Sequence, residues 1–218
     1  MEQSLSKKIV LQAVKSFNKQ GIISTSLRQI AKEIGISDGH LRYYFKTKED
    51  LIIGVYQEMV SCRKKIERNI PKKTPLWKNI ILQLEGSLML QSQFSGLYSD
   101  SYQLFKKYPK LKKMHREIKQ LQKVYFIEEN KKNIERGIFD SSLTELRLFL
   151  IQEQFAILID TWVLYYLNES KNNLINEQVV KHFTAVIIGS FLPYLNKELQ
   201  KEIEVWMRKN IQKNIFDI

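Results

Sequence analysis

The sequence predicts an all-α protein, with a small N-terminal domain of three short helices followed by a larger helical bundle. Gly and Pro are scarce, at 8 and 4 of 218 residues, which favours long helices over a turn-rich β architecture. Apolar residues recur at steps of three and four along most of the chain, and no stretch shows the alternation of a half-buried strand. Together the segments predict about nine to ten helices in total.

Three short helices are expected at the N-terminus. The segment Leu5–Lys19 has an amphipathic spacing, and Gly21 lies just past its end, where glycine commonly terminates a helix. Ser26 opens a capping box and therefore begins the second helix, which Gly35 ends. Ser37 follows directly and can cap the third helix.

Another cap signature begins at Thr47 and opens a fourth helix, which runs to about Asn69. Pro71 and Pro75 then interrupt the helical pattern. We therefore expect three parts. They are the short helices over residues 1–50, a connecting helix over 51–70 and a helical domain over 71–218.

The rest of the chain divides into six segments with helical periodicity. Their approximate bounds are 76–94, 97–107, 109–136, 142–168, 176–193 and 196–211. Asn176 and Asn196 are the expected caps of the last two. The most apolar stretch, Phe155 to Leu167, is short and carries Asp160 in its middle, so we expect a buried helix and not a membrane span.

Composition limits the compartment and the partners. The formal net charge is +12, which favours polyanions such as nucleic acid or an anionic membrane surface. Residues 1–70 carry thirteen Lys and Arg against seven Asp and Glu, a net +6, so half of the charge lies in a third of the chain. Cys62 is the only cysteine, and the stretch Met1–Lys8 is polar. We expect a cytoplasmic protein.

The stretch from residue 25 to residue 51 has the pattern of a helix-turn-helix, in which the first helix braces the second against the major groove of DNA. Ala31 is small where the two helices must approach closely, and Gly35 supplies the turn. Ile30, Ile36 and Leu41 can form the small core between them. Double-stranded DNA is therefore the expected partner.

The outer face of the second helix is too polar and aromatic to be core. The candidate DNA-binding residues are Thr25, Ser26, Arg28, Ser37, Gly39, His40, Arg42, Tyr43, Tyr44, Lys46 and Lys48. Within this set, His40, Arg42 and Tyr43 are candidate readers of base edges, although an arginine can address bases or phosphates. The candidate phosphate anchors are Thr25, Tyr44, Lys46 and Lys48.

This stretch, together with the helix before it, resembles the DNA-binding domain of the TetR/AcrR family. The resemblance covers about residues 5–55. The matching positions are Thr25-Ser26, Ile30-Ala31, Gly35-Ile36-Ser37, Gly39, Leu41, Tyr43-Tyr44-Phe45 and Lys46-Thr47-Lys48-Glu49-Asp50-Leu51. Two positions depart from the family pattern. Asp38 stands where the family often has Lys, and Arg42 stands where it often has Tyr, which leaves the target sequence and the contact map open.

The resemblance implies a homodimeric regulator, more often a repressor, whose last two helices pair with those of a partner and whose inner helices hold a small-molecule effector. The expected interface residues are Val186, Phe191, Ile203 and Trp206, and the alternative is that they form core within one chain. The expected pocket residues are Trp77, Tyr98, Tyr102, Phe105, Phe155, Asp160 and Trp162. For each aromatic residue the alternative is again core packing, and Asp160 requires a polar or charged partner.

One feature fits none of these roles. The run Lys106–Lys123 holds eight Lys and Arg against a single acid, Glu117, a net +7. Such a run is commonly a solvated helix face, and it can also bind polyanions or an anionic membrane. The competing function is accordingly a helical adaptor of the same fold that acts through a protein or membrane partner.

Other classes of function find no support in the sequence. The three histidines, His40, His115 and His182, have no metal-ligand spacing, so we expect no metal. No phosphate-binding glycine loop, nucleophile elbow or acid–base pair occurs in a suitable context, so we expect no cofactor and no enzyme activity.

Overall fold

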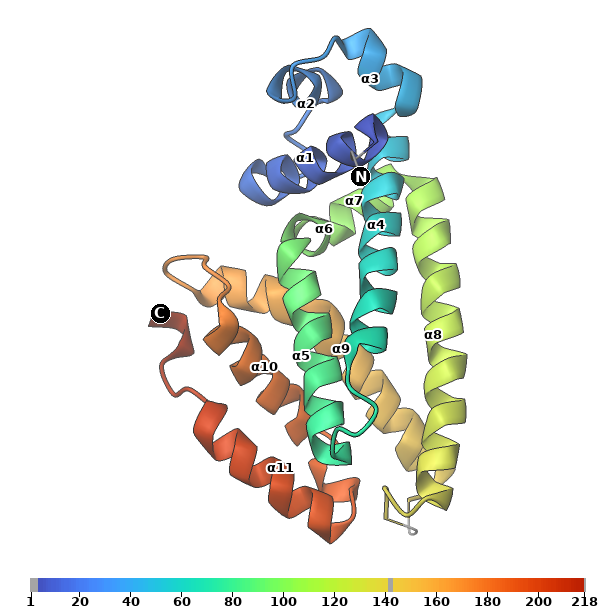
Figure 1. The fold of residues 1–218 in the computed structure, drawn as a ribbon, viewed down its shortest axis with the longest axis vertical. Coiled ribbons are helices and arrows are strands. Elements are labelled where there is room, and N and C mark those ends of the chain that lie inside the picture. The colour runs from blue at the N-terminus through green and yellow to red at the C-terminus, as the bar shows by residue number, and fades with distance from the viewer. Residues whose placement is uncertain (1–3, 141–142, 218) are drawn as a thin grey trace. The chain divides into compact units, whose positions relative to one another are not determined.

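A computed structural model describes residues 4–140 and 143–217 of the chain. These residues form eleven α-helices, two short 3-10 helices and one isolated β-bridge between Phe139 and Leu195 (Figure 1). The helices are α1 Leu5–Gln20, α2 Leu27–Glu33, α3 Asp38–Tyr44, α4 Lys48–Asn69, α5 Leu76–Gln93, α6 Ser95–Ser99, α7 Ser101–Lys107, α8 Pro109–Glu135, α9 Glu145–Glu169, α10 Glu177–Gly189 and α11 Lys197–Asn210, with 3-10 helices η1 Leu192–Tyr194 and η2 Ile215–Asp217. The predicted all-α class is confirmed, and the additional helix arises because the expected segment 97–107 divides at Asp100.

The chain forms two compact units. The N-terminal unit holds the chain up to Lys65 together with Leu90–Arg116, and the C-terminal unit holds Ile66–Met89 and the chain from Glu117 onward. The local proline signals predict a boundary near residue 71, whereas the chain first passes from one unit to the other between Lys65 and Ile66. The segment 90–116 returns to the N-terminal helices through contacts between residues distant in sequence, which a local pattern does not report.

Polar caps begin the helices where the sequence indicated. Ser26 accepts a hydrogen bond from the backbone N–H of the third residue beyond it at 3.1 Å, and Ser37 does the same at 3.1 Å. Asn176 and Asn196 cap α10 and α11 in the same way. Thr144 caps α9. The sequence predicted that this helix begins at residue 142, and residue 142 lies outside the described residues.

Within the N-terminal unit, α6 packs closely on α1. A Cβ atom on Gly96 would lie 2.7 Å from the backbone oxygen of Phe17, so only glycine allows this approach. Asn18 fixes the contact from both sides, because its amide donates to the carbonyl of Gln93 at 2.7 Å and its oxygen accepts from the N–H of Gly96 at 3.0 Å. The last turn of α1 is therefore held by a segment more than seventy residues further along the chain.

The same unit joins α4 to the start of α8. The Glu49 carboxylate, in the first turn of α4, accepts from the backbone N–H groups of Lys110 at 2.9 Å and Leu111 at 3.3 Å. About two turns further along α4, the hydroxyl of Tyr56 lies 2.9 Å from Nδ1 of His115 on α8. These contacts fix the first two turns of α8 against α4.

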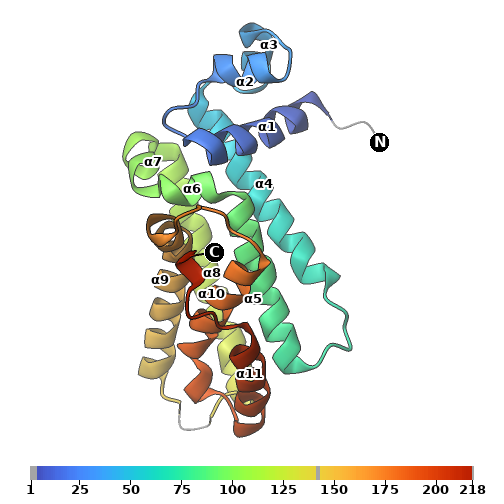
Figure 2. The same cartoon turned by 90° about the vertical axis from the view of Figure 1, so that its left-hand side faces the viewer.

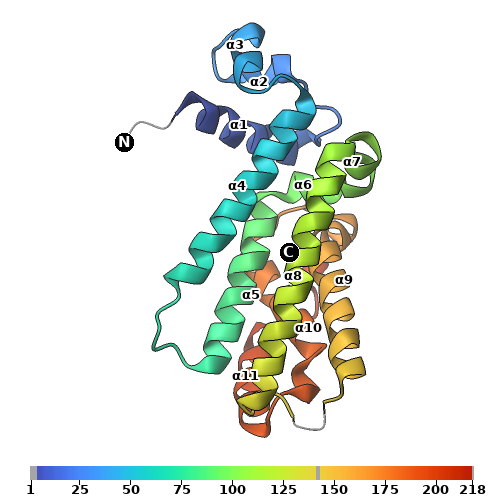
Figure 3. The same cartoon turned by 90° about the vertical axis from the view of Figure 1, so that its right-hand side faces the viewer.

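The C-terminal unit is a helical bundle in which α8 and α9 lie side by side (Figure 3). Lys119 forms an ion pair with Asp160, and Lys123 forms one with Glu153 at 2.7 Å. The partner that Asp160 required is thus another side chain of the protein. On its other side, α9 packs against α10, and α10 packs in turn against α11 (Figure 2).

Helix α9 is less buried than its apolar sequence predicted. Within the described part of the chain it is long and apolar enough, by length and composition, to cross a membrane, and only 28% of its most apolar window is buried. One face, with Trp162, Val163 and Tyr166, lies in the core. The opposite face exposes an apolar stripe at helical spacing, which consists of Leu146, Leu150, Ile157 and Leu164. We refer to these four residues as the α9 stripe.

Candidate DNA-binding interface

Helices α2 and α3 and the turn between them have the geometry of a helix-turn-helix. Gly35 adopts a left-handed backbone with φ of 75°, which glycine accommodates without strain. The next residue, Ile36, returns its N–H to the carbonyl of Ala31 at 3.0 Å. Ile30 and Leu41 are buried between the helices, as expected for the small core of this motif.

The outer face of α3 carries the aromatic and imidazole side chains. Tyr43 is 81% exposed and Tyr44 is 40% exposed. Tyrosine side chains are on average partly buried in folded proteins, so the exposure of Tyr43 is high for this residue type. Their rings meet edge to face at 5.2 Å, and the His40 ring lies 5.9 Å from that of Tyr44. The three rings therefore present one surface of hydrogen-bonding and apolar groups.

Arg42 does not extend freely from this face. Its Nε donates to the carboxylate of Asp38 at 2.7 Å, and its Nη1 donates to the carbonyl of Lys46 at 3.2 Å. The two departures from the family pattern thus form an ion pair with each other at the i and i+4 positions. This pair neutralises the acid within the recognition helix.

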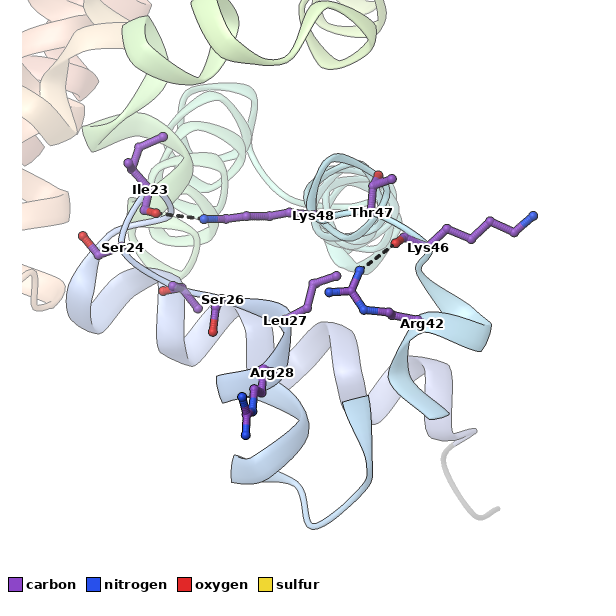
Figure 4. A pocket seen from close by; sticks show the side chains of 10 residues that line it. Ile23, Ser24, Ser26, Leu27, Arg28, Arg42, Lys46, Thr47 and Lys48 are labelled. Carbon is purple, nitrogen blue, oxygen red and sulfur yellow. Dashed lines mark hydrogen bonds between the residues drawn. The ribbon is translucent and has the colours of Figure 1, made fainter. Parts of the chain in front are cut away.

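A cleft of about 460 Å³ opens beside α3, between the start of α2 and the start of α4 (Figure 4). Its lining residues are Ile23, Ser24, Thr25, Ser26, Leu27, Arg28, Arg42, Lys46, Thr47 and Lys48. Four of them are basic and none is acidic. Such a concave, basic surface suits an oxyanion.

Lys48 crosses this cleft, as Figure 4 shows. Its ammonium group donates to the carbonyl of Ile23 at 2.9 Å, which ties the start of α4 to the loop before α2. Partial burial lowers the pKa of Lys48, and the positive charge of Lys107 lowers it further. A phosphate in the cleft would oppose both effects, because it would bring a negative charge to a partly desolvated cation.

Thr25 occupies a different place from the one expected of a phosphate anchor. Its side chain is buried, donates to the carbonyl of Gly21 at 2.8 Å and accepts from the amide of Gln20 at 3.2 Å. The hydroxyl therefore stabilises the turn between α1 and α2. The hydroxyls of Ser26 and Ser37 remain on the exposed surface while they cap their helices.

A network behind the interface was not foreseen from the sequence. The Glu33 carboxylate, at the end of α2, accepts from Ser16 at 2.5 Å, from Gln12 at 2.8 Å and from Gln29 at 2.9 Å. These hydrogen bonds hold the pKa of Glu33 below its ordinary value. Because two of the donors lie on α1, the network fixes α2 to α1. No local pattern marks it, since the donors are ordinary polar side chains far away in sequence.

The aromatic residues expected to line an effector pocket lie in both units. Tyr98, Tyr102 and Phe105 belong to the N-terminal unit, and Tyr102 is 74% exposed, so it lines no enclosed cavity. The Phe105 ring packs on His115 at 4.5 Å. For Phe105 the core interpretation therefore applies.

The remaining pocket candidates belong to the C-terminal unit. Trp77 is half-buried on α5. Phe155 lies between the rings of Phe126 and Phe191, at 5.7 and 6.1 Å, and the buried Trp162 packs on Phe183 at 5.3 Å. These rings form an aromatic layer inside the bundle.

The residues expected at a dimer interface differ in how far they are exposed. Val186 is exposed on α10, whereas Phe191 and Trp206 are half-buried. Ile203 is fully buried in its own chain, so it belongs to the core of the protomer. The outward face of α11 is instead mostly charged.

Comparison with known proteins agrees with this geometry. Residues 9–55 match the family described as bacterial regulatory proteins, tetR family, and residues 63–203 match its companion described as bacterial transcriptional repressor. The fatty acid metabolism regulator protein of Bacillus subtilis strain 168 is 29% identical over 93 residues, which is 42% of this chain and 45% of that protein. The match thus spans less than half of this curated relative.

Two solved structures show the same fold. A TetR-family transcriptional regulator from Marinobacter aquaeolei VT8 has a TM-score of 0.80 at 21% identity, over 96% of this chain and all of that one. The fatty acid degradation regulator FadR of Bacillus halodurans has a TM-score of 0.67 at 19% identity, over 87% and 97% of the two chains.

The two family matches together cover most of the chain, and the fold is that of DNA-binding regulators rather than enzymes. The chain is therefore a member of the TetR family of bacterial transcriptional regulators.

Proposed function

We propose that the protein binds a near-palindromic operator as a homodimer, represses transcription there, and leaves the DNA when a small-molecule effector binds. The observation that carries this proposal is the exposed aromatic face of α3, which occurs together with the basic cleft that Figure 4 shows. A surface of this kind matches a recognition helix in the major groove, flanked by contacts to the sugar–phosphate backbone. The protein would work in the cytoplasm, where the DNA is.

The side chains divide between two tasks. His40 and Tyr43 reach furthest from α3 and read base edges, with Gly39 allowing close approach of the helix and Tyr44 supporting the rings. Arg28, Arg42, Lys46 and Lys48 line the cleft and bind phosphates. Arg42 is assigned to phosphates because Asp38 and the carbonyl of Lys46 already direct its guanidinium towards the cleft.

The homodimer would form through the α9 stripe. Leu146 and Ile157 are 68% and 61% exposed, and Leu150 and Leu164 are 41% and 38% exposed, although all four are apolar. The neighbouring helix adds Val186. Several exposed apolar residues on one helix face commonly mark an interface. Two such stripes packed against each other would bring α9 of each protomer into the dimer interface. The sequence had instead predicted an interface formed by the last two helices, α10 and α11.

The effector would bind in the C-terminal unit and favour a conformation whose two α3 helices no longer match successive major grooves. Its differential affinity for the two conformations supplies the energy for release. The two relatives named for fatty acid regulation make fatty acids and their derivatives the first class to screen. The aromatic layer around Phe155 and Trp162 offers an apolar environment for such a chain.

The test is selection of bound duplexes from a random DNA pool. The proposal predicts a near-palindromic consensus that is bound on the order of a thousandfold more tightly than random DNA. Recovery of no consensus, with equal binding to all duplexes, would contradict sequence-specific regulation. The selected duplex then becomes the probe for repression in a reporter assay and for release by effectors.

A further inference from the structure

The basic run from Lys106 to Lys123 is divided by the structure into two parts. In the C-terminal unit, Lys119 and Lys123 are neutralised by Asp160 and Glu153 of α9. In the N-terminal unit, residues 101–116 hold six Lys and Arg and no acid. Four of them, Lys106, Lys107, Lys110 and Lys112, are exposed and form no ion pair with any described residue. We refer to these four as the α7–α8 lysines.

These lysines lie in the same compact unit as the helix-turn-helix. Asp100, at the start of α7, accepts from the N–H of Ile22 at 2.9 Å, which fixes α7 to the loop before α2. Glu49 fixes the start of α8 to the first turn of α4 through Lys110 at 2.9 Å. Both anchoring acids are occupied by backbone N–H groups, and Figures 1 and 3 show α7 and the start of α8 beside α4.

The loop before α2 and the first turn of α4, to which α7 and α8 are anchored, both line the basic cleft. Ile23 follows directly on the N–H that Asp100 holds, and Lys48 precedes Glu49 in the first turn of α4. Lys107 is close enough to Lys48 for its charge to act on it. Through Lys107, the α7–α8 lysines thus adjoin the Lys48 side of the basic cleft, and they bring four further positive charges to the same unit.

We propose that the α7–α8 lysines form a second DNA-contacting surface, which binds the phosphates of the duplex that flanks each half-site, irrespective of its sequence. This inference rests on the proposed operator binding and extends its footprint. Unpaired lysines suit this role, because an ammonium on a flexible stem binds phosphate as a point charge. Phosphate neutralisation releases counterions, so the contribution must depend on salt.

The experiment compares two duplexes, one that ends at the selected operator and one that carries about ten additional base pairs, roughly one helical turn, on each side. Wild-type protein is expected to bind the extended duplex on the order of 10-fold more tightly at low salt, with a steeper salt dependence. The variant Lys106→Ala/Lys107→Ala/Lys110→Ala/Lys112→Ala should lose this preference and bind both duplexes alike. Its plot of log affinity against log salt on the extended duplex should be flatter by about 3 to 4 per protomer.

The matched control is Lys201→Ala/Lys209→Ala, which removes two exposed lysines from α11 in the other unit. It should retain the wild-type preference for the extended duplex. Thermal unfolding of each variant establishes that the fold is intact. If the four-lysine variant unfolds early, charge reversal at Lys106 and Lys107 alone provides the same comparison, because both are exposed on the last turn of α7.

Each outcome has a distinct meaning. Equal wild-type affinity for both duplexes would overturn this inference and leave operator binding intact, whereas failure to bind either duplex specifically would overturn operator binding itself. Vesicles containing phosphatidylserine provide the last arm. If wild type binds them, the four-lysine variant does not, and flanking DNA has no effect, the surface belongs to anionic lipid and the inference is wrong.

Discussion

At the scale of single residues, the side chains of the candidate interface differ in whether hydrogen bonds within the chain fix their positions. Arg42 and Lys48 are directed by acceptors within the chain, namely Asp38 and the carbonyls of Lys46 and Ile23. Tyr43 is exposed, and its ring meets that of Tyr44. A side chain that is fixed in a cleft can bind a repeated feature such as phosphate, whereas an exposed one can respond to the identity of a base.

This difference predicts separable effects of two substitutions. Lys48→Ala should weaken binding to operator and random DNA by the same factor and flatten the salt slope by about 1 for each protomer, because one phosphate contact is lost. Tyr43→Ala should reduce the ratio of specific to random affinity, with little change in slope. Fluorescence anisotropy at several salt concentrations measures both.

Arg28→Ala provides a comparison from the other side of the cleft and should behave as Lys48→Ala does. If Lys48→Ala changed the preferred sequence, or if Tyr43→Ala weakened all duplexes alike, the division between readers and anchors would be wrong.

Glu33 predicts how the N-terminal unit responds to acid. Its three hydrogen bonds hold its pKa in the folded protein below the ordinary value of 4.5. The carboxylate therefore stabilises the fold fully above that value, and this stabilisation is lost as the pH falls through the lower, folded-state pKa. Glu33→Gln should accordingly lower the free energy of unfolding at pH 7 and have progressively less effect towards pH 3.

Urea unfolding at a series of pH values measures this difference. Glu202→Gln, at an exposed position on α11, is the control and should change the stability little at pH 7. A Glu33→Gln effect that stayed constant or grew as the pH fell would show that the three hydrogen bonds do not favour the charged carboxylate.

At the scale of elements, the contact of α6 with α1 depends on one glycine. Gly96→Ala would place a Cβ atom 2.7 Å from a backbone oxygen of Phe17, which cannot move without displacing α1. We expect a loss of about 1–3 kcal/mol in the free energy of unfolding, as for other overpacked sites. Gly189→Ala is the matched control, because its Cβ would meet only the end of Met207 at 3.6 Å. Calorimetry that ranked the two variants equally would contradict this contact.

Helix α9 carries the prediction about assembly. Ile157→Arg places a charge in the α9 stripe, where the side chain is 61% exposed in a single protomer, so the fold should tolerate it. Paired stripes would bury that charge without a partner, and we expect sedimentation to show monomers. Val205→Arg, at a 55% exposed position on α11, should remain dimeric. A dimeric Ile157→Arg protein would place the interface elsewhere.

The elements that the sequence predicted best are those with local signals. Ser26, Ser37, Asn176 and Asn196 begin helices because each supplies an acceptor to N–H groups within its own first turn. The division at Asp100 was missed, because that residue is held by the distant N–H of Ile22 and its local sequence carries no break. The exposure of α9 was not predicted, because apolar periodicity does not distinguish a face that lies in the core from one that is exposed.

At the scale of the whole molecule, the helix-turn-helix could be predicted from the sequence, while the hydrogen-bond partners of its side chains could not. The pattern from residue 25 to residue 51 indicated the two helices and the glycine turn between them. It did not indicate that Thr25 is buried or that Lys48 reaches Ile23, since both depend on the path of a loop. The assignment of Leu90–Arg116 to the N-terminal unit likewise depends on contacts across the chain.

We propose that two copies of α3 read two successive major grooves of one operator, and the spacing of the half-sites tests this directly. Inserting five base pairs between the selected half-sites rotates one against the other by about half a helical turn. We expect the affinity to fall towards the level for random DNA, on the order of a thousandfold, and to recover in part when about ten base pairs are inserted. Equal affinity for all three spacings would contradict the dimeric reading of DNA.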